Sequence, residues 1–202
     1  TFVRVDPVRH IASEGSVSVI DLTAGGTTAG PQTEILTGLH ASALALTPNG
    51  RWLVVANAGS DTLSVLDTRT DRIVETIGMR QNPADLFGAQ PNALAFDPSG
   101  KRLFVCNGSQ NAVAVIDFEP GQSKPRGLIP VGWFPGAITV ASHAADTSLY
   151  VANIKGIGST KKYQPGEKVE YNSHQYFGTL SLVPVPGKRE LARMTQIALG
   201  NM

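Results

Sequence analysis

Residues 39–77 read LHASALALTPNGRWLVVANAGSDTLSVLDTRTDRIVETI, and this stretch decides the fold. It contains four short apolar runs, at 43–46, 53–56, 63–66 and 73–77. The segments between them are rich in Pro, Gly, Asn, Asp and Ser, which favour tight reversals because they preset φ, tolerate positive φ or bond their own backbone. Four runs of strand length joined by such turns predict an antiparallel meander. A single meander of this size cannot bury both faces, so we expect it to be one unit of a repeat.

The same pattern returns in residues 91–131, and equivalent positions lie 50 residues apart. The matching pairs are Ala43 and Ala93, Pro48 and Pro98, Gly50 and Gly100, Asn57 and Asn107, and Asp67 and Asp117. A recurring unit of four strands predicts an all-β protein, a β-propeller of four-stranded antiparallel blades. About three and a half blades are present, so we expect them to be part of a larger ring. The expected units are the end of an upstream blade (1–38), a blade (39–78), a second blade (91–131), a last blade (135–187) with a long insertion (155–177), and a short helix or linker (188–202).

Two segments carry a family resemblance: GRWLVVAN at 50–57 and GKRLFVCN at 100–107. Each is followed by a small polar turn and a short apolar strand ending in Asp, and this pattern resembles the YVTN-type β-propeller repeat. The order of the segments 152–159 and 178–186 and the following helix resembles a subfamily in which the last blade precedes an alkaline-phosphatase-like phosphoesterase domain. This resemblance implies a covalent neighbour domain after Met202 and phosphoesterase activity in the full-length protein. None of the metal-binding motif of such a domain lies within these residues.

Composition limits the partners. The 17 basic and 16 acidic residues nearly balance, so we expect no nucleic-acid partner. No apolar run approaches the ~18 residues that a membrane span needs. The single cysteine, Cys106, lies in an expected strand, and we interpret it as a buried apolar residue rather than a reactive thiol. We expect a periplasmic or extracellular location.

Propeller topology places certain loops on one face. The loop that enters each first strand and the loop that joins the second strand to the third lie together, and the insertion 155–177 replaces one of the latter. A loop longer than ~15 residues inside a compact domain is usually functional or disordered. We therefore expect a protein or small-molecule ligand to bind at this mouth. The candidate ligand-binding residues are His40, Gln90, Trp133, Phe134, Lys161, Tyr163 and His174.

Signals for catalysis are weak. The four histidines share no metal-binding spacing, no cysteine pair exists and no G-x-S-x-G motif is present, so we predict no metal site and no cofactor in this segment. The recurring Asn57, Asn107 and Asn153 are interpreted as turn-formers. The sequence thus favours a non-catalytic binding or scaffold module. The alternative is a propeller enzyme, a hydrolase or lyase, that uses the mouth under the insertion, with His40 and His174 as candidates.

Overall fold

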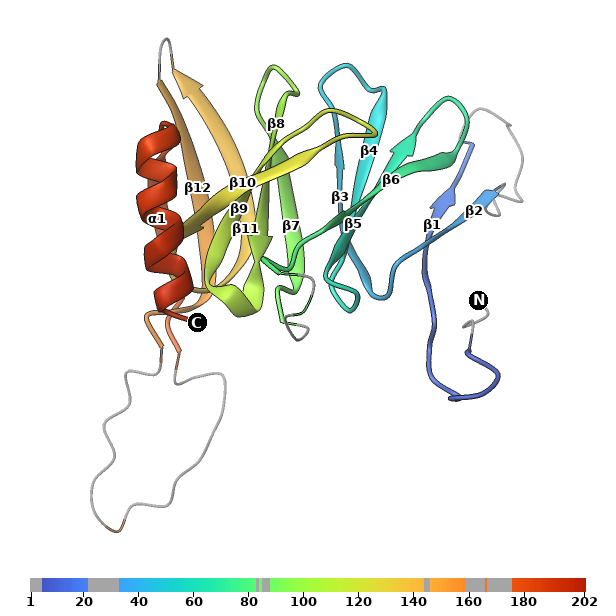
Figure 1. Cartoon of the computed structure of the whole chain (residues 1–202), viewed down its shortest axis with the longest axis horizontal. Coiled ribbons are helices and arrows are strands. Elements are labelled where there is room, and N and C mark those ends of the chain that lie inside the picture. Colours follow the sequence, from blue (N-terminus) through green and yellow to red (C-terminus); the bar gives the residue numbers. More distant parts are fainter. Residues whose placement is uncertain are drawn as a thin grey trace.

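The computed structural model describes residues 5–21, 33–82, 84, 88–143, 146–158, 166 and 176–202 (Figure 1). Its elements, in chain order, are β1 (Gly15–Val19), β2 (Thr33–Thr37), β3 (Ala41–Leu46), β4 (Trp52–Asn57), β5 (Thr62–Asp67), β6 (Arg72–Gly78), β7 (Pro91–Phe96), β8 (Arg102–Asn107), the short 3₁₀ helix η1 (Gly108–Gln110), β9 (Ala112–Asp117), β10 (Lys124–Pro130), β11 (Trp133–His143), β12 (Asp146–Gly156), β13 (Thr179–Pro184) and α1 (Lys188–Gly200). No helix within the described residues has the length and apolar character needed to cross a membrane.

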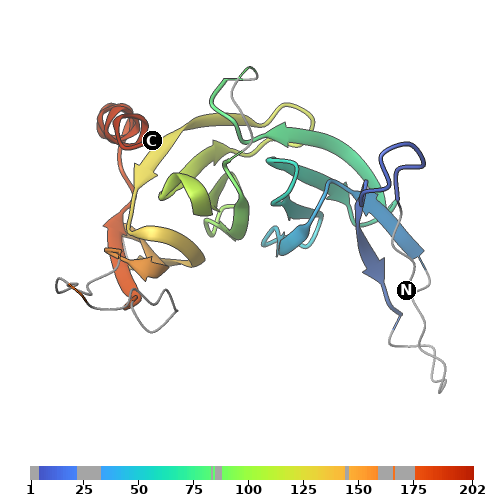
Figure 2. The same ribbon diagram turned by 90° about the horizontal axis from the view of Figure 1, so that it is seen from below.

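The strands form separate antiparallel sheets. Two sheets have four strands, in the orders β3-β4-β5-β6 and β7-β8-β9-β10, a third contains β11-β12-β13, and β1 pairs with β2. Each strand pairs with its neighbour in the chain, so the four-stranded sheets are simple meanders. The sheets follow one another along an arc, which is the arrangement of blades in part of a propeller (Figure 2). The predicted all-β fold of four-stranded antiparallel blades is confirmed.

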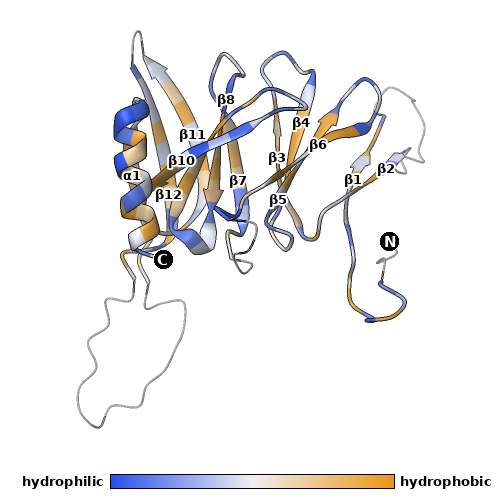
Figure 3. Ribbon diagram, in the orientation of Figure 1, coloured by the Kyte–Doolittle hydropathy of each residue, from blue (hydrophilic) through white to orange (hydrophobic). Residues whose placement is uncertain are grey.

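The core lies between the blades, and the central strands contribute to it from both faces. Val54 and Val55 on β4 are both fully buried, but Val54 packs into the cluster shared with β8 and β9, whereas Val55 packs toward β1 and β2. Likewise Leu103 and Phe104 on β8 belong to different clusters on opposite sides of their sheet. Alternation of side chains along a strand sends neighbouring residues to opposite faces. The unbroken apolar runs of the sequence are therefore explained by cover on both sides. Figure 3 shows the apolar residues along the strands of the sheets.

The recurring asparagines, which were interpreted as turn-formers, bond two kinds of partner. The side chains of Asn57, Asn107 and Asn153 are buried. The amide nitrogen of Asn57 donates to the hydroxyl of Ser64 on the next strand at 2.9 Å, and that of Asn153 donates to the hydroxyl of Ser181 at 2.9 Å. The amide of Asn107 instead donates to the side-chain carbonyl of Gln110, in the turn that follows, at 2.8 Å. For Asn57 and Asn153 the turn-former interpretation is incomplete, because their amides bond hydroxyls on the next strand of the same sheet.

The outer rim joins neighbouring blades. The carboxylate of Glu75 on β6 accepts hydrogen bonds from the backbone N–H of Gly121 and from the N–H and hydroxyl of Ser123, in the hairpin between β9 and β10. Helix α1 packs on β10, where the Thr195 hydroxyl accepts a bond from the Leu128 N–H at 2.9 Å. Leu191 on the inner side of this helix joins the apolar cluster of the last two blades.

Cys106 is fully buried on β8, which confirms the interpretation of this residue as an apolar core residue. Burial raises the pKa of its thiol to about 12, because the charged thiolate would lose its hydration. The reactive thiolate is therefore scarce at pH 8.

We expect the thiol of Cys106 in the native chain to react with a disulfide reagent at least on the order of 100-fold more slowly than in the chain unfolded by guanidinium chloride. The measurement is the absorbance of the released thiolate over time, and equal rates in the two solvents would contradict the burial of this thiol.

Candidate functional site

One edge of the sheets carries the residues that enter each blade, and we call it the mouth face. The carbonyl of His40, just before β3, accepts a bond from the Ala58 N–H at 2.9 Å, and that of Gln90, just before β7, accepts one from the Gly108 N–H at 3.0 Å. In the last blade Trp133 pairs with Gly156 at the end of β12. In each blade, therefore, the entering residues lie beside the turn that follows the second strand, at the lower edge in Figure 1.

The entering residues share an uncommon backbone conformation. His40, Gln90 and Phe134 have φ values of +58°, +52° and +57°, in the left-handed region. This region costs a residue with a bulky side chain about 1 kcal/mol, so the surrounding structure has to hold it in place. The same strained position thus recurs three times at the mouth face, with a different side chain each time.

Side chains of the preceding blade hold two of these strained residues, Gln90 and Phe134. Asp61, in the turn between β4 and β5, accepts hydrogen bonds from the N–H groups of Gly88 and Gln90 at 2.6 and 2.8 Å. Asn111, 50 residues later, accepts one from the N–H of Phe134 at 2.9 Å. Sequence reasoning missed these two residues, which we call the mouth clips. Their equivalent positions before a third strand were the available signal.

Asp61 is 2% exposed and has a φ of +52° itself, so we expect its replacement to be costly. Asp61→Ala leaves two backbone N–H groups without acceptors and places alanine in the left-handed region. The free energy of unfolding should fall by about 2–3 kcal/mol, and by about half as much for Asp61→Asn, which keeps one acceptor. Denaturation by urea measures both values.

The matched control is Asp71→Asn, in the turn between β5 and β6 at the opposite edge, where φ is +54°. This change should alter the free energy of unfolding by less than about 0.5 kcal/mol. If Asp61→Asn and Asp71→Asn cost the same, the side chain of Asp61 does not hold the mouth.

Aromatic side chains gather at the last blade. The rings of Trp133 and Tyr176 meet edge to face, with centroids 5.9 Å apart and an angle of 89° between their planes. The ammonium of Lys155 lies 5.1 Å from the centroid of the Trp133 ring, 5.6 Å from that of Phe134 and 5.8 Å from that of Tyr176. The structure therefore brings two predicted site residues, Trp133 and Phe134, together with two residues that were not among the candidates.

The other candidates are placed less closely. The side-chain carbonyl of Gln90 accepts a bond from the Ser109 hydroxyl at 2.7 Å, and the side chain of His40 is exposed. No hydrogen bond joins the His40 side chain to the other candidates in the part of the chain that the structure describes. Lys161, Tyr163 and His174 lie outside the described residues.

A cavity of about 300 Å³ opens on the mouth face between the second and third blades. Trp133 forms one wall, and Ala198 and Asn201 at the end of α1 form another. Among residues 5–21, 33–82, 84, 88–143, 146–158, 166 and 176–202, no three His, Cys, Asp or Glu side chains form a group that could hold a metal ion. The cavity thus offers an aromatic wall and amides rather than a set of metal ligands.

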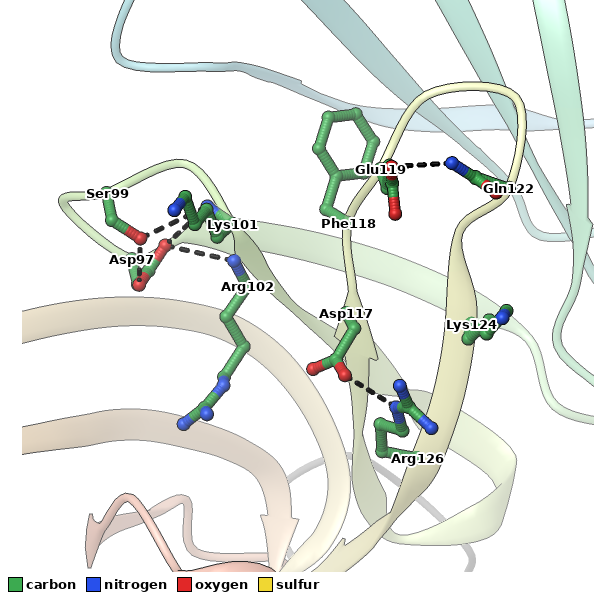
Figure 4. Close-up of a pocket in the computed structure, with 10 residues that line it drawn as sticks. All are labelled: Asp97, Ser99, Lys101, Arg102, Asp117, Phe118, Glu119, Gln122, Lys124 and Arg126. Carbon is green, nitrogen blue, oxygen red and sulfur yellow. Dashed lines mark hydrogen bonds and ion pairs between the residues drawn. The ribbon is translucent and has the colours of Figure 1, made fainter.

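A larger cavity, of about 750 Å³, lies at the opposite edge between the hairpins of the second blade (Figure 4). Its acidic side chains are engaged within it. Asp97 accepts bonds from the backbone N–H groups of Lys101 and Arg102, and Asp117 forms an ion pair with Arg126 at 2.6 Å. These contacts stabilise the hairpins themselves, so we place the candidate site at the mouth face.

The blades and the loops gathered at their mouth define this chain as part of a β-propeller. Residues 13–129 match the family described as lactonase, 7-bladed beta-propeller, and the chain therefore belongs to that family. Among solved structures, Kuenenia stuttgartiensis hydrazine synthase is similar at 26% identity and a TM-score of 0.46, over 58% of this chain and 32% of that chain. The chain thus spans about a third of the length of that chain. No curated protein matches it.

Proposed function

We propose that this chain is a non-catalytic binding or scaffold module that recognises a ligand at its mouth face. The observation that carries this proposal is a backbone conformation that recurs in equivalent loops at the mouth face. His40, Gln90 and Phe134 occupy the same strained backbone position, yet their side chains are a base, an amide and an aromatic ring. A rigid scaffold that presents different side chains from equivalent loops is typical of recognition surfaces.

The charges nearest the mouth support binding over acid–base chemistry. Both carboxylate oxygens of Asp61 accept backbone N–H groups, and its counterpart Asn111 is an amide that does not ionise in the physiological range. A general base must lie within reach of the proton that it removes, and Asp61 is only 2% exposed. These clip residues hold the entering loops and leave the exposed side chains to contact a ligand.

The chain would be the YVTN-type propeller portion of a larger bifunctional protein, secreted or periplasmic, whose other part is a phosphoesterase domain. The resemblance of its C-terminal segments to propeller–phosphoesterase proteins supports this proposal. Helix α1 ends on the side of the mouth face (Figure 1), so a domain joined after Met202 would start beside the candidate site. Ligand binding there would then occur next to the catalytic domain.

A second candidate is an enzyme, a hydrolase or lyase, with its site at the mouth under the loop 155–177. The membership in a family described as lactonase favours this candidate. His40 on the mouth face and His174 in the loop would be its candidate acid–base groups.

Turnover by the 202-residue chain separates the two. We expect no hydrolysis of p-nitrophenyl phosphate, bis-p-nitrophenyl phosphate or glucono-δ-lactone above the uncatalysed rate, with or without added Zn²⁺ or Mg²⁺. Turnover that His40→Ala or His174→Ala lowers by about 100-fold, while His143→Ala at the far end of β11 leaves it unchanged, would overturn the binding-module proposal in favour of the enzyme.

A further inference from the structure

The cluster beside Trp133 has the geometry of a cation site. Three rings surround one ammonium, that of Lys155, at 5.1 to 5.8 Å from its nitrogen to their centroids. A cation within about 6 Å of a ring centroid is attracted by the negative face of the ring. We call the three rings, those of Trp133, Phe134 and Tyr176, the aromatic cage.

The cage is built into the backbone rather than formed by chance contact of mobile side chains. A Cβ at Gly158 would lie 3.1 Å from ring atoms of Trp133, and one at Gly108 would lie 3.1 Å from the Phe134 ring. Both rings therefore rest on glycines that leave room for them. The N–H bond to Asn111 fixes Phe134, and the edge-to-face contact with Trp133 orients Tyr176.

The present occupant suits this cage poorly. Lys155 forms no ion pair with a carboxylate within the described residues, and ring faces provide only weak acceptors for its three N–H groups. A primary ammonium is compact and strongly hydrated, so it loses much hydration when it enters such a site. A quaternary ammonium carries four carbon substituents and has no N–H groups to satisfy, and aromatic cages are known to bind such groups.

We propose that the aromatic cage binds the quaternary ammonium group of a small zwitterionic ligand, and that Lys155 is an internal occupant that the ligand displaces. The flexible four-carbon stem of Lys155 lets its ammonium leave the cage while staying beside it. There it pairs with the anionic group of the same ligand. Trp133 is 40% exposed, so a ligand reaches the cage from solvent. This assignment rests on the proposed binding role of the mouth face and names its ligand class.

Fluorescence of Trp133 tests the proposal. The chain has two tryptophans, and Trp52→Phe removes the other one, which lies at the opposite end of β4. In this background, tetramethylammonium and phosphocholine should change the emission saturably, with phosphocholine about tenfold tighter because its phosphate pairs with Lys155. The neutral 3,3-dimethylbutanol, which has the same shape without the charge, should not saturate. Sodium chloride at equal ionic strength is the blank.

Variants separate a cage from a merely apolar pocket. Tyr176→Ala should weaken tetramethylammonium binding about tenfold, whereas Phe177→Ala, at a neighbouring ring that is 69% exposed and outside the cage, should leave it unchanged. Lys155→Ala should tighten tetramethylammonium about fivefold, since the competitor is gone, and weaken phosphocholine about fivefold.

Equal affinity for the neutral alcohol, no saturable response in either the parent or Lys155→Ala, or weaker tetramethylammonium binding in Lys155→Ala would each overturn the cation site. Because the readout is fluorescence, these outcomes are independent of the turnover that would overturn the proposed function.

Discussion

The structure depends on strands that are buried on both faces. Val54 and Val55 are adjacent on β4 and both are inaccessible to solvent. Because neighbouring residues of a strand face opposite sides, both faces of the sheet must be covered at β4. The same holds for Leu103 and Phe104 on β8. Each of these two blades must therefore be covered by another sheet on each side, and the arc of sheets in Figure 2 follows from this requirement. The mouth face exists because blades stacked in this way bring their entering loops to one edge.

Most of the fold could be predicted from the sequence because its signals repeat. Turn residues recur at a spacing of 50 positions, and the apolar runs between them have the length of strands. The grouping of His40, Gln90 and Phe134 on one edge also followed from topology alone. The direction of the Asn57 side chain did not, because asparagine is common in turns and the sequence does not show whether its amide meets the turn or the next strand.

The details of the candidate site were harder to predict for a physical reason. Asp61 and Asn111 have the composition of ordinary turn residues, and only the backbone geometry shows that they accept N–H groups from the next blade. Lys155 and Tyr176 lie near the two ends of the insertion 155–177, so their spacing in the sequence carries no information about contact. The regular blades determine where the entering loops lie, whereas the side chains at the mouth face differ from one repeat to the next.

The buried asparagines have a consequence for folding. Similar blades in one chain risk exchanging strands while they fold, for example by pairing β4 with β9 instead of β5. In the native sheet the Asn57 amide meets the hydroxyls of Thr62 and Ser64, but the equivalent positions on β9 are Ala112 and Ala114. The exchanged pair would lose both hydroxyl partners of the buried Asn57 amide, at about 1–3 kcal/mol. These two polar contacts thus distinguish one blade from its near-copy and favour the correct assembly of the repeat.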